Sequence, residues 1–209
     1  SRTSGPTTME VALSNAGSGR GGADGPTMIV GGDGIVRQSR QERVTSDYDS
    51  PKLSAKLTWD PAGPQALNVT GQYQRVYERF REDSLRTGPG QPDEFRTVRQ
   101  RENRWNYELG GDYAFPLAGG TFKAIGLLRR SHDPFSVEVI SRLADGSAPA
   151  GERFTQAGDL DEKVGRGEFG WSMLGGDWQV AGEAAFNSLD NVAALFTLVD
   201  RRTLSALAS

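Results

Sequence analysis

The most regular feature of the chain is an alternation of apolar and polar residues with a period of two. Between Leu53 and Trp59 the odd-numbered positions are apolar, and Ser54, Lys56 and Thr58 lie between them. Such a period places alternate side chains on opposite faces of a β-strand. The same pattern predicts strands at Leu67–Tyr73, Trp105–Phe115, Gly165–Met173 and Trp178–Phe186. Phe122–Leu128 carries apolar residues on both faces, so its orientation stays open.

Turn residues separate these segments in a regular way. Short Gly- and Pro-rich turns of the kind that joins antiparallel strands occur at Asp60–Pro64, Pro116–Gly120 and Leu174–Asp177. Longer polar stretches, Glu82–Phe95 and Arg142–Gly158, lie between them. We therefore expect an all-β, antiparallel up-and-down meander of about six to eight strands. Its short turns would lie at one end and its long outer loops at the other.

The chain divides into regions of different composition within one structural unit, residues 1–209. Residues 1–36 are expected to be a Gly-rich loop region, and residues 37–188 hold the hairpins. Residues 189–209 form a tail of uncertain structure. Apolar residues at helical spacing make Ser188–Ala206 the best helix candidate, although no clear stop signal follows it.

Composition narrows the classes of function. The chain has 36% apolar residues, a net charge of −3, one His and no Cys. These counts exclude disulfides, thiolate metal sites, cysteine nucleophiles and multi-His zinc sites. No apolar run is long enough for a transmembrane helix. The near-neutral charge argues against a nucleic-acid partner.

The two faces of the predicted strands match a transmembrane β-barrel. A membrane strand needs roughly 9–11 tilted residues with alternate side chains toward lipid, and such barrels carry aromatic girdles. The expected lipid-facing girdle is Trp59, Tyr73, Tyr113, Phe115, Trp171 and Trp178. The expected lumen-facing residues are Lys56, Glu108, Asp112, Glu168 and Glu183. A soluble antiparallel β-protein, acting as a glycan- or protein-binding module, is the alternative interpretation.

Three segments resemble a known family of membrane barrels. Tyr48–Pro61, which ends in Leu-Thr-Trp-Asp-Pro, resembles an early barrel strand of TonB-dependent outer-membrane receptors. Arg101–Leu117 resembles a later strand with its turn, and Glu183–Asp190 fits the same pattern. The resemblance covers most of residues 37–198, and its motifs are diffuse because barrel strands are patterned rather than fixed in sequence.

The resemblance implies an N-terminal plug inside a barrel of about 22 strands. It also implies energised uptake of a scarce solute, such as an iron chelate, a vitamin or a glycan, across the outer membrane of a Gram-negative bacterium. Partners would be outer-membrane lipid, an unidentified small-molecule substrate and TonB. No plug, TonB box, signal segment or terminal aromatic strand is recognisable in the chain. We therefore expect a fragment of the barrel wall, with TonB engaged only through absent N-terminal regions.

A basic cluster is the main candidate for ligand binding. Its members are Arg75, Arg79, Arg96, Arg99, Arg101 and Arg104, and Arg81 lies nearby. They could form an electropositive mouth for an anionic ligand. The simpler interpretation is a solvated outer wall in which Glu78, Glu82 and Glu102 pair with the arginines.

Other motifs give weaker signals. Gly17–Gly22 matches G-x-G-x-x-G, but Pro26 follows where a dinucleotide site needs a helix. His132 beside Asp133 is expected in a loop, and Asp159, Asp161 and Glu162 are expected in a solvated loop. We therefore predict no catalytic residue, no metal site and no cofactor, and we do not expect an enzyme.

Overall fold

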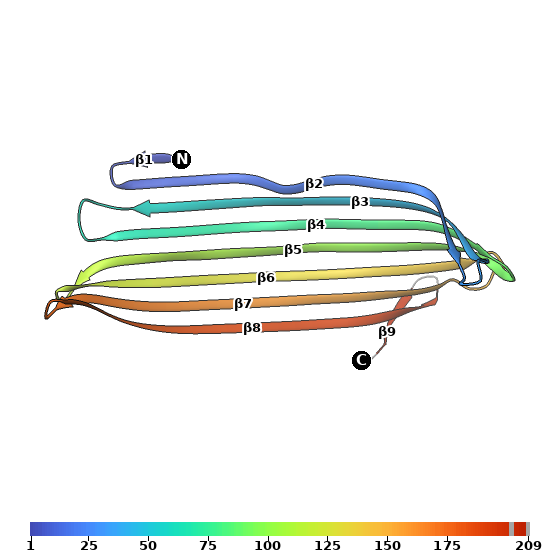
Figure 1. Cartoon of the computed structure of the whole chain (residues 1–209). Coiled ribbons are helices and arrows are strands. Elements are labelled where there is room, and N and C mark those ends of the chain that lie inside the picture. Colours follow the sequence, from blue (N-terminus) through green and yellow to red (C-terminus); the bar gives the residue numbers. More distant parts are fainter. Residues whose placement is uncertain (201–202, 208–209) are drawn as a thin grey trace.

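The computed structural model, which describes residues 1–200 and 203–207, is a single antiparallel sheet (Figure 1). Its nine strands lie side by side in chain order. They are β1 (Arg2–Ser4), β2 (Thr7–Val30), β3 (Val36–Trp59), β4 (Ala66–Gly88), β5 (Gln91–Leu117), β6 (Gly120–Leu143), β7 (Ala150–Met173), β8 (Gly176–Asp200) and β9 (Thr203–Leu207). The predicted all-β, up-and-down meander is confirmed, with seven long strands and a short strand at each edge.

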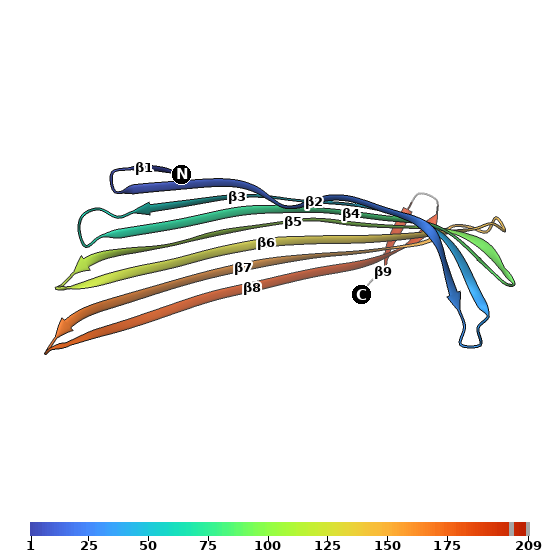
Figure 2. The ribbon, with the colours of Figure 1, turned by 45° about the horizontal axis from the view of Figure 1, so that its top comes forward.

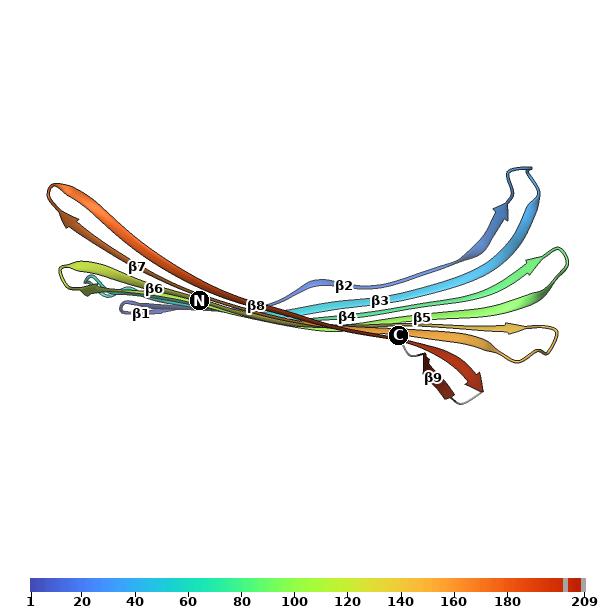
Figure 3. The ribbon, with the colours of Figure 1, turned by 90° about the horizontal axis from the view of Figure 1, so that it is seen from below.

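The sheet is open. Each strand pairs only with its neighbours in the chain, and the first and last strands do not pair with each other. We call the end of the sheet with the β3–β4, β5–β6 and β7–β8 connections the turn side and the opposite end the loop side. Figures 2 and 3 show one curved layer, and the loop-side ends of β2 and β3 bend most strongly out of its plane. The described residues contain no helix that is long and apolar enough to cross a bilayer.

The outer loops are shorter than the sequence predicts, because most of the residues assigned to them extend the strands. Of Glu82–Phe95, only Pro89 and Gly90 lie outside β4 and β5. Of Arg142–Gly158, only residues 144–149 separate β6 from β7. These segments lack alternation because both of their faces are polar, and only the partner strand makes them recognisable as strands.

The prediction of a Gly-rich loop over residues 1–36 is also wrong, since β2 fills most of that region. Glycine has a low intrinsic preference for strands, but backbone pairing with β3 holds this segment in the extended conformation. Gly17 is needed for close packing, because a Cβ there would lie 2.7 Å from the ring of Tyr48. Pro26 is tolerated because β2 has β3 on one side only over this part of its length.

The helix candidate Ser188–Ala206 and the expected tail are strand wherever they are described. β8 continues to Asp200, and its pairing with β7 runs without a shift from Met173–Gly176 to Glu152–Thr197. Hydrogen bonding to the edge of β7 therefore outweighs the helical spacing of the apolar residues in this segment. Residues 201–202 and 208–209 of the tail lie outside the described residues.

The sheet has almost no core of its own. Among the residues whose side chains are described, Val76 is the only hydrophobic one that is buried, at 6% exposure. Leu13 is 81% exposed, and Leu109 and Trp178 are about half exposed. A single layer cannot cover its own apolar side, so this surface needs an apolar environment from elsewhere.

Candidate functional site: two faces and an arginine cluster

The strand register fixes which residues share a face, because directly paired residues point to the same side. Leu53 pairs with Tyr73, and Tyr73 pairs with Tyr107. We call the side that carries these three residues the apolar face and the opposite side the polar face. The register extends both faces from β2 to β8 without a break in the turn-side half.

The turn-side half of the apolar face is covered by a continuous apolar band. Its members come from all seven long strands and include Met9, Val11, Leu13, Leu53, Leu57, Trp59, Leu67, Val69, Tyr73, Tyr107, Leu109, Tyr113, Phe115, Phe122, Leu128, Phe169, Trp171, Trp178, Val180 and Phe186. All six predicted girdle residues are in this set. The open orientation of Phe122–Leu128 is also settled, because Phe122 pairs with Phe115. Ile125 and Leu127 therefore face the polar side.

Aromatic side chains border the band at both ends. Near the short turns, Tyr113 stacks on Phe115 with ring centroids 5.3 Å apart, and Phe169 stacks on Trp171 at the same distance. Toward the other end, Trp105 stacks on Tyr107 at 6.1 Å. All four tryptophans of the chain, Trp59, Trp105, Trp171 and Trp178, are on this face.

The aromatic border is displaced along the strands as it crosses the sheet. The row of paired residues through Trp59 runs Leu67, Tyr113, Ala124, Gly167 and Gly182. On β8 the aromatic residue is Trp178, four positions nearer the turn than Gly182. Such a displacement is compatible with the register stagger of tilted strands in a barrel-like meander.

The polar face of the same half carries paired charges. Lys56, Glu108, Asp112, Glu168 and Glu183, the predicted lumen residues, all lie on it. Most of their contacts link neighbouring strands: Arg129 lies 2.7 Å from Glu108 and 3.3 Å from Glu162, and Lys123 lies 3.3 Å from Asp112. Arg166 lies 2.7 Å from Glu168 on its own strand and 3.4 Å from Glu183 on the next. Lys56 lines a shallow depression with Glu10 and Glu108. The polar face of this half therefore carries a network of ion pairs.

The predicted basic cluster is split between the two faces. Arg75, Arg79, Arg99 and Arg101 share the apolar face, beyond the loop-side end of the band. Arg96 and Arg104 lie on β5 but point to the polar face. The register adds Arg81 and Arg153 to the first group. Sequence reasoning missed Arg153, because two strands of unknown register, β5 and β6, lie between its strand β7 and β4.

The carboxylates predicted to neutralise the basic cluster lie on the polar face, so they share a side only with Arg96 and Arg104. Glu82 contacts Arg86, and Glu102 contacts Arg104, all on the polar face. Glu78 is paired in register with Glu102 and shares that face. On the apolar face, the partners are Asp83 and Glu138 instead.

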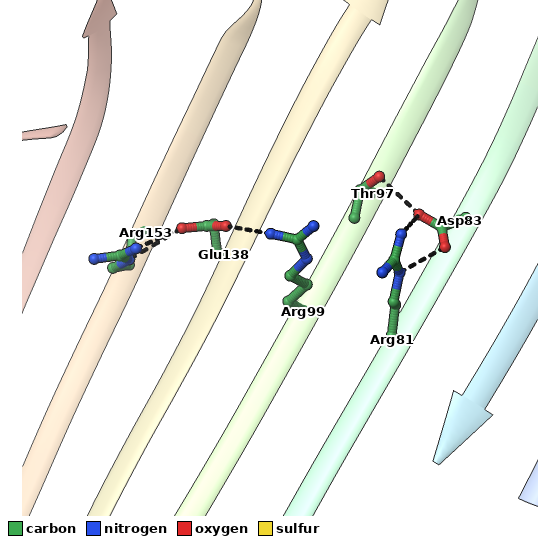
Figure 4. Close-up of polar contacts among 6 residues, drawn as sticks. All are labelled: Arg81, Asp83, Thr97, Arg99, Glu138 and Arg153. Carbon is green, nitrogen blue, oxygen red and sulfur yellow. Dashed lines mark hydrogen bonds and ion pairs between the residues drawn. The ribbon is translucent and has the colours of Figure 1, made fainter. Parts of the chain in front are cut away.

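We call the arginines on the apolar face beyond the band the arginine cluster: Arg79, Arg81, Arg99, Arg101 and Arg153. Figure 4 shows the polar contacts of three of them, Arg81, Arg99 and Arg153. Arg81 donates to Asp83 at 2.6 Å, and the Thr97 hydroxyl donates to the same carboxylate at 2.8 Å. Glu138 bridges two strands, lying 2.6 Å from Arg153 and 3.5 Å from Arg99. The hydrogen bond from Arg81 lowers the pKa of Asp83 and raises the pKa of Arg81 itself.

Like charges face each other directly within the cluster. Arg79 is paired with Arg101, and Arg81 is paired with Arg99. Directly opposed like charges destabilise a sheet. Arg79 and Arg101 are exposed, and within the described residues neither has a carboxylate within 4.0 Å. The cluster therefore carries excess positive charge on an accessible surface.

Arg75 occupies the border between the apolar band and the cluster. Its guanidinium lies 5.0 Å from the centre of the Tyr77 ring and donates to Asn103 at 3.0 Å. The side chain thus extends along the strand toward the loop-side end, away from the band. An arginine at an apolar boundary commonly places its charged end this way.

The remaining candidates are dispersed. Gly17–Gly22 is part of β2, with no helix after it in the described residues. His132 lies inside β6 rather than in a loop, with Nδ1 2.9 Å from Asp159. Asp161 contacts Arg130, and Glu162 contacts Arg129 on the opposite face. The three acids therefore do not converge, and the described residues hold no group of three metal-binding side chains.

Comparisons with protein families, with curated proteins and with solved structures find no match to this chain. Functional inference therefore depends on the geometry of the two faces.

Proposed function

We propose that the chain is a wall segment of an outer-membrane β-barrel. The observation that carries this proposal is the exposed apolar band, bordered by aromatic residues at both ends and backed by a polar face. Along β5 the band extends from Trp105 to Phe115, which is about 34 Å at the usual strand rise. Barrel strands tilt by about 35–45°, so the band would be about 25 Å high, as in membrane barrels.

The curvature of the sheet supports the same orientation. In the loop-side half, Ser84, Arg86 and Val76 on the polar face are buried, whereas the arginine cluster on the apolar face is mostly exposed. The sheet therefore curls toward its polar face. Closing it in that direction would put the ion-pair network inside the barrel and the apolar band outside, against lipid.

The open edges support a wall that is completed by more strands. Hydrocarbon offers no hydrogen-bond partners, so every backbone group of a membrane strand must be paired. Among the described residues, neither edge of the sheet is paired over its whole length. Additional strands, from more chain or from another copy, would continue the sheet on both sides.

We further propose that the complete barrel is a TonB-dependent receptor that takes up a scarce solute. The support is the sequence resemblance together with strands of 23–27 residues, which exceed the 9–11 needed to cross a bilayer. The excess lies on the loop side, where it would form a tall wall outside the membrane. The solute would belong to the iron-chelate, vitamin or glycan class.

The membrane proposal is tested by tryptophan fluorescence, since all four tryptophans lie on one face. The chain is refolded with phosphatidylcholine vesicles and with vesicles of brominated phosphatidylcholine, whose acyl chains quench nearby indoles. Strong quenching, with a compact form on unheated gels, is expected. A compact form in plain buffer that brominated lipid does not quench would favour the soluble glycan- or protein-binding module instead.

The uptake proposal has its own test in the bacterium that encodes the chain. The encoded protein should co-fractionate with the outer membrane, and a deletion strain should grow more slowly when its iron, vitamin or glycan supply is limiting. Normal growth under every such limitation would contradict the uptake role while leaving the membrane wall intact.

A further inference from the structure

The arginine cluster lies on the side of the sheet that faces lipid in the proposed barrel, just beyond the aromatic border. On β4, Arg79 is two residues past Tyr77, about 7 Å along the strand. On β5, Arg101 is four residues past Trp105, about 13 Å along the strand. Strand tilt reduces both heights. The cluster is therefore level with, or just above, the head groups of a bilayer that covers the band.

The side chains of the arginine cluster also line two shared depressions in the surface. One shallow depression is lined by Arg79, Arg81, Arg99 and Arg101 together with Thr45 and Asp47. A second depression beside it shares Arg99 and Arg101 and adds Ser136, Glu138, Arg153 and Thr155. Guanidinium groups and hydroxyls lining one surface are the donors that bind phosphate oxygens, and arginine does so through two parallel hydrogen bonds.

Charge balance supports an anionic occupant. Asp83 and Glu138 are already engaged by Arg81, Arg99 and Arg153. Arg79 and Arg101 oppose each other, and Asp47, the carboxylate opposite Arg79 on β3, contacts Arg20 instead of Arg79. A phosphate placed between these strands would turn a repulsive pair into a shared binding site.

The face on which the arginines lie distinguishes between the possible ligands. A solute passing through the barrel would meet the polar face, where Arg96 and Arg104 point. Arg79, Arg81, Arg99 and Arg101 point outward instead. The initial hypothesis of an electropositive mouth for a transported anion therefore does not suit these four residues, whereas a ligand in the surrounding membrane surface does.

We propose that Arg79, Arg81, Arg99 and Arg101 bind the phosphate groups of anionic lipid head groups around the barrel wall. This inference rests on the proposed membrane function, because it needs the apolar band to be embedded. Each arginine near an anionic membrane surface contributes about a fivefold preference. Removing two should lower the preference for a phosphorylated lipid about 25-fold.

The test compares two double variants on the same strand. Arg99→Gln/Arg101→Gln removes charge from the cluster, whereas Arg96→Gln/Arg104→Gln removes equal charge from the polar face. Each refolded chain is added to phosphatidylcholine vesicles that contain brominated phosphatidic acid or brominated phosphatidylcholine. The ratio of tryptophan quenching by the two brominated lipids gives the preference for phosphatidic acid.

The expected result is a preference for phosphatidic acid in the unmodified chain and in Arg96→Gln/Arg104→Gln, with an approximately 25-fold loss in Arg99→Gln/Arg101→Gln. Equal loss in both double variants, or no loss in either, would overturn the proposal. Complete displacement by inorganic phosphate would also overturn it, by assigning the cluster to a free anion. Absence of quenching by any brominated lipid would instead refute the membrane function itself.

A single variant on another strand guards against a folding defect. Arg79→Gln should lower the preference about fivefold while leaving the gel mobility and circular dichroism of the folded chain unchanged. If Arg99→Gln/Arg101→Gln fails to fold, Arg79→Gln decides the question alone. An unchanged preference in that variant then contradicts the assignment.

Discussion

Leu109 and Glu108 are neighbours on β5 whose side chains meet different surroundings. Leu109 is 50% exposed on the apolar face, whereas Glu108 accepts hydrogen bonds from Arg129 on the polar face. At the residue scale, the strand therefore alternates between a position that needs apolar cover and a position that needs a charged partner. In lipid, an added charge should therefore destabilise the chain more on the apolar face than on the polar face.

Leu109→Arg tests this alternation near the middle of the band. A charge facing hydrocarbon should lower the free energy of unfolding in phosphatidylcholine vesicles by about 2–4 kcal/mol, as measured by denaturant titration. Gln72→Arg is the matched control, since it adds the same charge on the polar face opposite Glu108. Its effect should stay below about 1 kcal/mol. Similar losses in the two variants would contradict the assignment of the faces.

Asp83 gives a prediction for the dependence of stability on pH. Hydrogen bonds from Arg81 and Thr97 lower the pKa of Asp83 from its ordinary value of 3.8, so the folded carboxyl binds a proton less readily than the unfolded one. The resulting stabilisation is complete above that value and is lost as the pH falls below it. The denaturant concentration at the midpoint of unfolding should therefore fall more between neutral and acidic pH in the unmodified chain than in Asp83→Asn. Parallel pH profiles would argue against the Arg81–Asp83 pair.

At the scale of the element, two of the hairpins are joined by two-residue turns with positive φ. Ala118 and Gly119 connect β5 to β6 with φ values of 47° and 78°, and Leu174 and Gly175 connect β7 to β8 with φ values of 56° and 77°. Two successive positive φ values define the turn whose twist best matches paired strands. Its first position favours Asn, and leucine is disfavoured there.

Leu174→Asn should therefore stabilise the β7–β8 hairpin. Leu174 is 91% exposed, so its removal costs no packing, and relief of left-handed strain should add about 0.5–1 kcal/mol. The free energy of unfolding in detergent is the measurement. Gly175→Ala, at a φ of 77°, should instead destabilise the chain by about 1 kcal/mol. A loss of stability in Leu174→Asn would mean that Leu174 itself makes a favourable contact.

At the scale of the whole molecule, one layer of sheet leaves both the apolar band and the strand edges uncovered. β1 pairs with only three residues of β2, so most of the outer edge of β2 has no partner in the described residues. Unpaired edges and exposed apolar patches both promote association with other chains.

The isolated chain should therefore self-associate in plain buffer, and detergent should reduce the size of the particles. Sedimentation velocity with and without a non-ionic detergent measures this directly. The apolar band explains the dependence on detergent, because micelles replace the missing cover. A monodisperse monomer in buffer would contradict both the membrane wall and the open edge.

The strand segments that the sequence predicts correctly are those with one apolar face. Trp105–Phe115 was recognised as strand because alternation there is strict, and the same reasoning separated Trp171 from Glu168. Alternation disappears in Glu82–Phe95 and in most of residues 1–36, and both segments were predicted as loops. Their strand structure comes from hydrogen bonds to a neighbouring strand, which no local pattern records.

The sequence by itself determined the strand segments of the turn-side half, the sites of the short turns, and the separation of aromatic from charged faces. These properties are local, since they depend only on the period of two and on turn residues. Tertiary structure alone decided which arginines share a surface. Arg79 opposes Arg101 while Arg96 turns away, because a cross-strand neighbour is set by register, and a shift of one residue would exchange the two faces.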